Sequence, residues 1–400
     1  MLGAVALGTT RLSHLAPGAD VASTAACLRR LGVRMETPAP QQLVVHGAGW
    51  NGLRAAGGPL DAGNSGTTLR LLAGLIASRP FRTVVAGDAS LSRRPMRRVI
   101  DPLTAMGATI GSTDGRAPLV IDGGPLAAVH WTSPVASAQV KSAIMLAALT
   151  AAGTTSVTEP LATRDHTERA FPAFGLHAAA EGLTVRVPGG QQATAPAEAL
   201  AVPGDPSSAA VWAAAAAAIP GSSVRIEGLC LNPRRLGFTR ALARMGARVT
   251  LSVTGDVGGE PVGVLEVAHE GHVEGATIAP GEVPDLIDEL PVLAARAALG
   301  GSLEVSGAGE LRVKESDRIS ALVSGLVALG VRAEERPDGF FVEGSRQPAG
   351  GTVDAAGDHR LVMAFALVAL GASGPTRITG AEAVAVSYPD FSRDLARLAE

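Results

Sequence analysis

Two phrases recur along the chain, and this repetition limits the possible folds more than any other feature of the sequence. The first phrase is an apolar, alanine-rich helix, a break at a small residue or proline, and then a strand of alternating polarity. It occurs at 2–12, 71–85, 143–157, 211–226, 293–305 and 363–378, with its breaks about 70–80 residues apart.

The second phrase is a helix that ends in an apolar residue followed by glycine, and then a strand. Glycine suits this place because the residue that ends a helix often adopts a left-handed conformation. The helix-ending glycines are Gly32, Gly107, Gly175, Gly246 and Gly330.

The repeats predict six helix–strand units, three in each of two similar α/β domains that cover residues 1–203 and 204–400. A sixth copy of the second phrase would begin with a helix at 389–399. At the other end, Met1 lies inside a helix with no strand ahead of it. We therefore expect that the chain begins within a unit and that its first strand segment is missing.

Composition narrows the class of protein. Hydrophobic residues make up 46%, charged residues 18%, and the net charge is −3, which gives no reason to expect binding to nucleic acid. The most apolar stretches, 209–219 and 361–370, are shorter than the roughly 20 residues that cross a bilayer, so they are predicted to be buried helices. We expect a cytoplasmic protein, since no signal peptide is recognised, and separately a monomer. Cys27 and Cys230 predict neither a disulfide framework nor a metal site.

Only two lysines occur, Lys141 and Lys314, so the 34 basic residues include 34 − 2 = 32 arginines. Lysine that persists in such a chain can mark a place where a compact ammonium group is needed. Chance survival at solvated positions is the alternative. Both lysines lie in dense polar strings, which favours the first interpretation.

Several polar strings in the first half could bind anions. Residues 63–70 precede an apolar helix, where backbone N–H groups and hydroxyls could hold an anion or simply cap the helix. Residues 87–98 contain four arginines suited to a carboxylate or phosphate, although a solvated basic face would explain Arg97 and Arg98 equally well. Residues 137–142 and 163–169 are also rich in hydroxyl and ionisable groups, whereas 204–209 indicates a capped helix start.

The second half supplies carboxylates as well as cations. Residues 284–291 place Asp285 at a predicted helix start, and residues 310–318 pack six charges into nine positions. The Asp-His-Arg string at 358–360 opens an apolar helix. We expect no metal, because cations dominate these strings, and no Walker or Rossmann glycine loop is present. Together the strings predict a cationic pocket for small anions, with a carboxylate or two for proton transfer.

Seven strings resemble, in order and spacing, those of the 3-phosphoshikimate 1-carboxyvinyltransferase (EPSP synthase) family, over roughly residues 1–400. They are residues 64–70, 87–96, 137–142, 164–169, 284–291, 311–318 and 358–360. The resemblance implies two inverted α/β domains of three units each that close on substrate, which agrees with the repeat. It also implies an enzyme without a cofactor, which makes 5-enolpyruvylshikimate 3-phosphate from phosphoenolpyruvate and shikimate 3-phosphate on the route to chorismate and the aromatic amino acids.

The resemblance assigns roles to individual residues. Asp285 is the candidate base for the attacking hydroxyl, and Glu315 is the candidate acid for the methylene carbon. The implied contacts to shikimate 3-phosphate are Ser137, Ala138, Gln139, Thr163, Arg164, Asp285 and Lys314. Those to phosphoenolpyruvate are Asn64, Gly66, Arg94, Gln139, Arg318, His359 and Arg360. These groups are expected to converge between the two domains.

The chain also departs from the family pattern. The Lys, Ser and Arg of the family's opening segment are not present in this sequence, and Val386 stands where some members carry a further lysine. Thr163 and Ala138 replace serines seen in many relatives. We therefore expect an enzyme whose recorded start is too late and whose 400-residue form turns over little substrate.

Two other functions stay open. A catalytically silent homologue could bind phosphorylated ligands without converting them, although the retained acids and cations favour an enzyme. The sister enzyme that acts on UDP-N-acetylglucosamine shares fold and donor, but residues 164–169 and 311–318 match the shikimate branch better.

Overall fold

Each predicted helix–strand phrase forms a helix followed by a strand in the computed structural model, which describes residues 1–271, 273–345 and 347–398. The pairs are α1 (Leu2–Val5) with β1 (Leu7–Ser13), α3 (Gly66–Ile76) with β5 (Arg82–Ala86), α5 (Ala138–Ala148) with β9 (Thr154–Thr158), α7 (Pro206–Ala218) with β13 (Ser223–Cys230), α9 (Leu290–Ala298) with β17 (Ser302–Val305), and α11 (His359–Leu370) with β21 (Thr376–Thr379).

The second phrase is confirmed as well, and its glycines all have positive φ, between 67° and 112°. The predicted helix at 389–399 is α12 (Phe391–Leu398), and Ala399 lies outside the described residues. The helices and strands around the glycines are α2 (Ala19–Arg30) and β2 (Arg34–Glu36), α4 (Arg97–Ala105) and β6 (Thr109–Thr113), α6 (His166–Ala170) and β10 (Ala179–Glu181), α8 (Gly237–Arg244) and β14 (Ala247–Val257), and α10 (Arg318–Ala328) and β18 (Arg332–Arg336).

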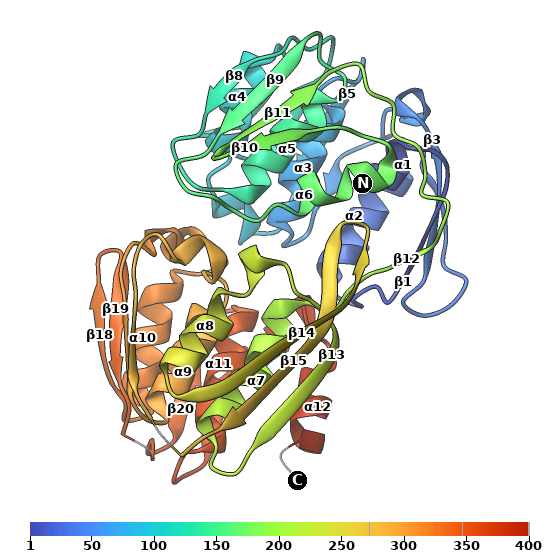
Figure 1. Ribbon diagram of the computed structural model, residues 1–400. Coiled ribbons are helices and arrows are strands. Elements are labelled where there is room, and N and C mark those ends of the chain that lie inside the picture. Colours follow the sequence, from blue (N-terminus) through green and yellow to red (C-terminus); the bar gives the residue numbers. More distant parts are fainter. Residues whose placement is uncertain (272, 346, 399–400) are drawn as a thin grey trace. The chain divides into compact units, whose positions relative to one another are not determined.

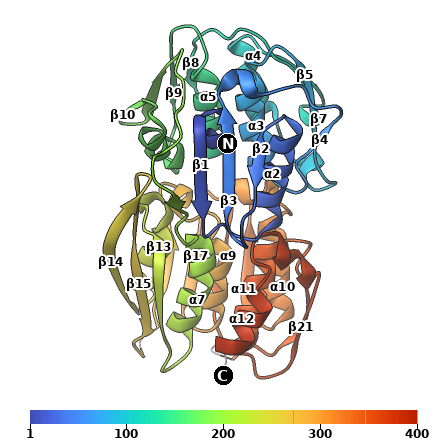
Figure 2. The same cartoon turned by 90° about the vertical axis from the view of Figure 1, so that its right-hand side faces the viewer.

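Contacts divide the chain into unit 1, residues 1–202 with 257–260, and unit 2, residues 203–256 with 261–400. Unit 1 contains three four-stranded sheets of one design, in which a parallel pair is followed by two antiparallel neighbours. Figure 2 shows β1, β3 and β2 of the first sheet side by side. The strand orders are β12 (Leu200–Ala201)–β1–β3 (Leu43–Ala48)–β2, β4 (Leu60–Asp61)–β5–β7 (Arg116–Asp122)–β6, and β8 (His130–Thr132)–β9–β11 (Thr184–Pro188)–β10.

The sheets of unit 2 follow the same design, but among the described residues two of them have fewer strands. The complete copy is β16 (Gly275–Ile278)–β17–β19 (Gly339–Glu343)–β18. In a second sheet, β13–β15 (Glu260–His269)–β14, the described residues form an isolated parallel bridge, from Gly204 to Leu229, in place of a first strand. Among the described residues, the sixth sheet is the parallel pair β20 (Gly351–Asp354) and β21.

Short 3₁₀ helices complete the structure: η1 (Trp50–Gly52), η2 (Leu91–Arg93), η3 (Pro172–Phe174), η4 (Pro233–Arg235), η5 (Val283–Asp285), η6 (Gly309–Val313) and η7 (Ala381–Val386). The predicted helix start at Asp285 is wrong, because this residue ends η5 and α9 begins five residues later at Leu290. Two prolines explain the difference. Pro284 starts the short turn, and Pro291 occupies the first turn of α9, where its missing N–H costs nothing.

Glycines let helices within each unit approach closely. Figure 1 shows α3 beside α5 in unit 1. A Cβ atom on Gly74 of α3 would lie 2.1 Å from the Ala143 carbonyl oxygen of α5. In unit 2, a Cβ on Gly325 of α10 would lie 2.2 Å from the ring of Phe365 in α11. Each unit has its own buried apolar cluster, and the predicted buried helices at 209–219 and 361–370 belong to that of unit 2.

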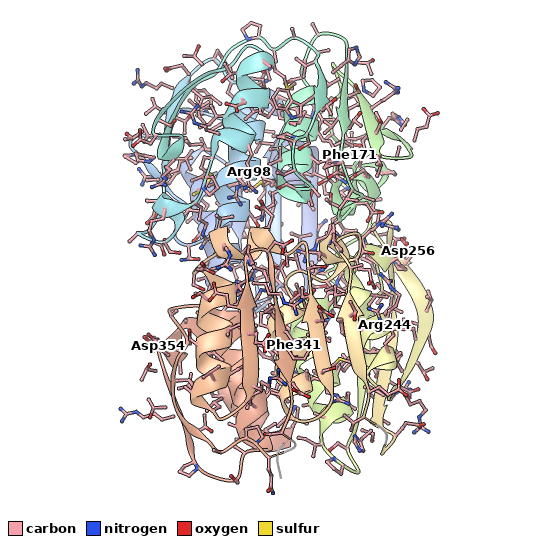
Figure 3. All side chains as sticks on the ribbon, turned by 90° about the vertical axis from the view of Figure 1, so that its left-hand side faces the viewer. Arg98, Phe171, Arg244, Asp256, Phe341 and Asp354 are labelled. Atoms are coloured by element: carbon pink, nitrogen blue, oxygen red, sulfur yellow. The ribbon has the colours of Figure 1, made fainter. Side chains whose placement is uncertain are left out.

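Charged side chains flank an aromatic ring on one sheet of unit 2. On β18 and β19, the guanidinium groups of Arg332 and Arg336 lie 5.9 and 6.0 Å from the ring centre of Phe341, which Figure 3 labels. Of the helices in the described part of the chain, none has the length and apolar composition needed to cross a membrane.

Candidate active site

In unit 1 the start of α3 brings Asn64 and Arg94 together. Ser65 caps the helix, since its hydroxyl accepts a hydrogen bond from the Thr68 N–H at 3.2 Å. The Asn64 side chain donates to Asp88 Oδ2 at 2.8 Å and accepts from Arg94 Nη2 at 2.6 Å. Arg94 is only 6% exposed. A buried guanidinium at a helix N-terminus suits an anionic ligand.

Gly66 and Gln139 belong to the same group. A Cβ on Gly66 would lie 3.0 Å from Arg70 Nη1 and 3.4 Å from Arg94 Nη1, so glycine keeps open the space between two guanidinium groups. Arg70 Nη1 donates to Gln139 Oε1 at 2.5 Å, and Gln139 Nε2 donates to Thr67 Oγ1 at 2.7 Å. Arg70 and Thr67 were not among the predicted site residues. Helical periodicity could have identified Arg70, which lies one turn after Gly66.

A second group in unit 1 forms where the segment after β9 meets α5. Ser137 caps α5 by accepting from the Val140 N–H, and Ala138 and Gln139 follow in the first turn. Thr163 is buried and donates to Glu159 Oε1 at 2.5 Å, and Arg164 follows it in the chain. The predicted contacts thus lie in two segments, the first turn of α5 and the segment after β9, which meet near Lys141. These contacts are Ser137, Ala138, Gln139, Thr163 and Arg164.

Lys141 is buried beside these residues with two carboxylates. Its Nζ lies 2.8 Å from Glu159 Oε2 and 2.7 Å from Glu168 Oε1. Burial by itself would lower the pKa of Lys141, but Glu168 and Glu159 more than offset this, and the pKa is raised. Burial also raises the pKa of Glu168, against the opposing effect of Lys141. The ammonium group therefore stays charged and is held between the two carboxylates.

In unit 2, three cations surround the carboxylate of Asp288. Its Oδ1 lies 3.5 Å from Lys314 Nζ, 3.6 Å from Arg318 Nη1 and 3.8 Å from Arg360 Nε. Arg360 also donates to the Asp288 backbone oxygen at 3.0 Å. The structure thus brings three predicted residues around a carboxylate that was not predicted to have a role.

Glu315 adds a second carboxylate to this group. It accepts a hydrogen bond from Arg318 Nη2, and its side chain is 18% exposed. Arg318 is fully buried, and its Nε and Nη2 donate to the two oxygens of Asp358 at 2.8 and 3.2 Å. Burial would lower the pKa of Arg318, but Asp358 and Glu315 raise it above its ordinary value. Arg318 is therefore a permanent cation in a low-dielectric place.

His359 is buried at the start of α11, whose cap is Asp358. Burial, together with the neighbouring charge of Arg360, lowers the pKa of His359 from 6.5 to about 4. The imidazole is therefore neutral near pH 7. It can donate or accept one hydrogen bond but adds no positive charge to the group.

The partners of Asp285 differ from those of Asp288. Its Oδ2 accepts from Arg240 Nη2 at 3.0 Å, and its Oδ1 lies 3.6 Å from Arg234 Nη1. These two arginines differ from the cations that surround Asp288. Asp285 and Asp288 of the 284–291 string have different surroundings because η5 ends between them.

A further polar group lies at the start of α7. Arg235 Nη2 donates to Asp205 Oδ1 and to Ser207 Oγ, both at 2.9 Å, and Ser207 donates to the buried carboxylate of Glu289. Burial would raise the pKa of Asp205, but Arg235 and Arg360 lower it to about 2. Asp205 also caps α7 as predicted. Neither Arg235 nor Glu289 was predicted to have a role: Arg235 lies outside the dense polar strings, and Glu289 lies within the 284–291 string beside Asp288.

No group of three or more metal-binding side chains occurs within the described ranges of the chain. The groups that the structure brings together are cations, hydroxyls and a few carboxylates. Such a set can neutralise phosphate and carboxylate groups and transfer protons.

Comparison with known proteins gives a consistent result. The family model for EPSP synthase (3-phosphoshikimate 1-carboxyvinyltransferase) matches residues 1–395. A 3-phosphoshikimate 1-carboxyvinyltransferase of Acidithiobacillus ferrooxidans is 50% identical over 392 residues, which are 98% of this chain and 90% of that protein. One of Chloroflexus aurantiacus is 48% identical over 407 residues, 100% of this chain and 93% of the relative.

Solved structures agree with this match. An EPSP synthase from Acinetobacter baumannii superposes with a TM-score of 0.86 at 41% identity, over 100% of this chain and 92% of that one. The predicted α/β fold with two similar halves is confirmed. With a family model that spans nearly every residue, the chain belongs to the EPSP synthase family.

Proposed function

We propose that the protein transfers the enolpyruvyl group of phosphoenolpyruvate to the 5-hydroxyl of shikimate 3-phosphate and releases phosphate. The observation that carries this proposal is the group in unit 2 where Lys314, Arg318 and Arg360 surround Asp288, with Glu315 alongside. Both substrates are anionic, and two unit charges about 4 Å apart repel by roughly 4 kcal/mol at an effective dielectric constant near 20. Clustered cations offset that cost.

The reaction requires three proton transfers, two during addition and one during elimination. The acceptor hydroxyl loses its proton as its oxygen bonds to C2 of phosphoenolpyruvate, while the methylene carbon gains a proton. Phosphate then leaves C2 while the adjacent methyl group, formed from the methylene carbon, loses a proton, and this restores the double bond. Glu315 is the proposed acid, as the resemblance implies, and it lies beside the cations that surround Asp288.

Two carboxylates compete for the role of base, and the geometry favours Asp288 over the predicted Asp285. Asp288 lies with Lys314 and Arg360, whereas Asp285 pairs with Arg234 and Arg240. A base must reach the hydroxyl of a substrate that the same cations hold.

The remaining assignments follow the resemblance residue by residue. In unit 1, shikimate 3-phosphate is assigned to Ser137, Ala138, Gln139, Thr163 and Arg164, and phosphoenolpyruvate to Asn64, Gly66, Arg94 and Gln139. In unit 2, Lys314 is assigned to shikimate 3-phosphate, and Arg318, His359 and Arg360 to phosphoenolpyruvate.

The test measures phosphate release from the two substrates by the wild type and by Asp288→Asn, Asp285→Asn and Glu315→Gln. We expect Asp288→Asn and Glu315→Gln to lower kcat about 10²-fold or more, and Asp285→Asn to lower it less than about threefold. A large loss only in Asp285→Asn would return the role of base to that residue.

The same assay separates the alternatives. Binding of both substrates without phosphate release would identify a silent homologue. Turnover with UDP-N-acetylglucosamine in place of shikimate 3-phosphate would identify the sister activity. Absence of binding and turnover with every one of these substrates would overturn the proposal.

We further infer a cytoplasmic monomer that needs no nucleic acid, membrane or cofactor. The support is the net charge of −3 and a reaction between two small anions. Gel filtration with light scattering checks the monomer, and a dimer mass would contradict it.

A further inference from the structure

Lys141 is the one lysine of unit 1, and its ammonium group is enclosed. The side chain is 3% exposed and lies within 2.8 Å of a carboxylate on each of two other segments. Glu159 follows strand β9, and Glu168 lies in helix α6. Lys141 itself stands in the second turn of α5. One ammonium group therefore joins three segments.

The connection extends to residues near the proposed acceptor site. Glu159 accepts from Lys141 with one oxygen and from the Thr163 hydroxyl, at 2.5 Å, with the other. Next to Lys141, the Ser142 hydroxyl forms a 2.7 Å hydrogen bond with the Thr167 hydroxyl. Residues 159–168 are thus attached to α5 at two successive positions, and they carry Thr163 and Arg164.

The enclosure excludes Lys141 itself as a ligand contact. Two buried carboxylates already occupy its ammonium group, so binding of a phosphorylated ligand there would leave those carboxylates unpaired at high cost. Lys141 can instead fix the positions of the segments that carry Glu159 and Glu168. A compact ammonium with three donors can meet two carboxylates from different directions, which the planar fork of arginine does poorly.

We propose that Lys141 is a positioning residue: through Glu159 and Glu168 it holds Thr163 and Arg164 beside the first turn of α5, and so sets the affinity for the phosphorylated acceptor. This inference rests on the proposed function, because the acceptor is identified there. The contacts on which it rests, from Lys141 to Glu159, Thr163 and Glu168, all lie within unit 1.

The test compares three variants of the full chain. Lys141→Met removes the ammonium group, and Glu168→Gln keeps a hydrogen-bond acceptor while it removes one of two buried carboxylates. Arg79→Met is the matched control, since Arg79 is a buried cation of unit 1 that donates to the Trp50 carbonyl oxygen instead. Calorimetry measures binding of shikimate 3-phosphate, steady-state kinetics give KM for both substrates, and peptide-resolved hydrogen exchange follows residues 159–168 without ligand.

We expect Lys141→Met to weaken acceptor binding about tenfold or more and Glu168→Gln about threefold. KM for phosphoenolpyruvate and kcat should change less than threefold. Exchange in residues 159–168 should accelerate in both variants and stay at the wild-type rate in Arg79→Met. If Lys141→Met does not fold, acceptor binding and hydrogen exchange in Glu168→Gln test the proposal.

Wild-type acceptor affinity in a folded variant, or an equal loss in Arg79→Met, would overturn the inference. If the wild type does not bind the acceptor, the proposed function fails. Hydrogen exchange then judges the positioning role by itself, and unchanged exchange in residues 159–168 would contradict it.

Discussion

At the residue scale, His359 links burial to a measurable pH dependence. Its pKa is lowered to about 4, whereas an unfolded histidine titrates near 6.5. Between these values the unfolded chain binds a proton that the folded chain does not. The free energy of unfolding therefore falls as the pH drops from 6.5 to about 4, by roughly 3 kcal/mol from this group.

His359→Gln should remove this contribution. We expect the difference in unfolding free energy between variant and wild type to change by roughly 3 kcal/mol across that pH window, in favour of the variant at low pH. Denaturant titrations at several pH values check it, with the exposed His177→Gln as the control for loss of an imidazole. A difference that does not vary with pH would show that the buried imidazole is not responsible.

Gly66 gives a prediction about substrate binding. Gly66→Ala would place a methyl group 3.0 Å from Arg70 Nη1 and 3.4 Å from Arg94 Nη1, in the space proposed for phosphoenolpyruvate. We expect KM for phosphoenolpyruvate to rise about tenfold, equivalent to about 1.4 kcal/mol, with a smaller change for the acceptor. Gly111→Ala, whose nearest neighbour atom is 3.7 Å away, is the control. Equal increases in KM for both substrates would contradict a specific role of Gly66 in binding phosphoenolpyruvate.

At the element scale, the recurring helix-ending glycines act through backbone conformation. Gly32 has φ of +91°, and a Cβ atom at this position would lie no closer than 3.5 Å to the atoms of Arg54. Gly32→Ala should therefore destabilise the protein by about 1 kcal/mol through left-handed strain and not through a clash. Thermal unfolding checks this, with Gly57→Ala as the control because it has open space around it. An equal loss in both variants would exclude conformational strain as the cause.

Local rules also account for where the helices begin. Ser65, Ser137, Asp205 and Asp358 all cap helices through a side-chain oxygen, and each could be placed from the sequence. The prediction failed at Asp285, where the acid and the proline before it resemble a helix start. Pro291 places the true start of α9 further along.

At the scale of the whole molecule, each unit is built around its own apolar cluster. Leu72 in unit 1 and Leu326 in unit 2 are both fully buried. Leu72→Ala and Leu326→Ala should each cost about 2–5 kcal/mol through lost transfer energy and cavity formation. Peptide-resolved hydrogen exchange should show the larger loss of protection in the unit that carries the substitution. Equal losses throughout the chain would mean that the two clusters unfold as one.

The sequence by itself determined the α/β class, the helix–strand units and the family, because helix ends, strand alternation and motif order are local properties that recur along the chain. Only the tertiary structure decided which carboxylate stands among the cations. Asp288 contacts Lys314, which lies 26 positions away in the sequence, and Arg360, which lies 72 positions away. Likewise, no local pattern shows that Lys141 is held by Glu159 and Glu168. Such contacts depend on how distant segments pack, and local spacing carries no information about which of several nearby acids will lie among Lys314, Arg318 and Arg360.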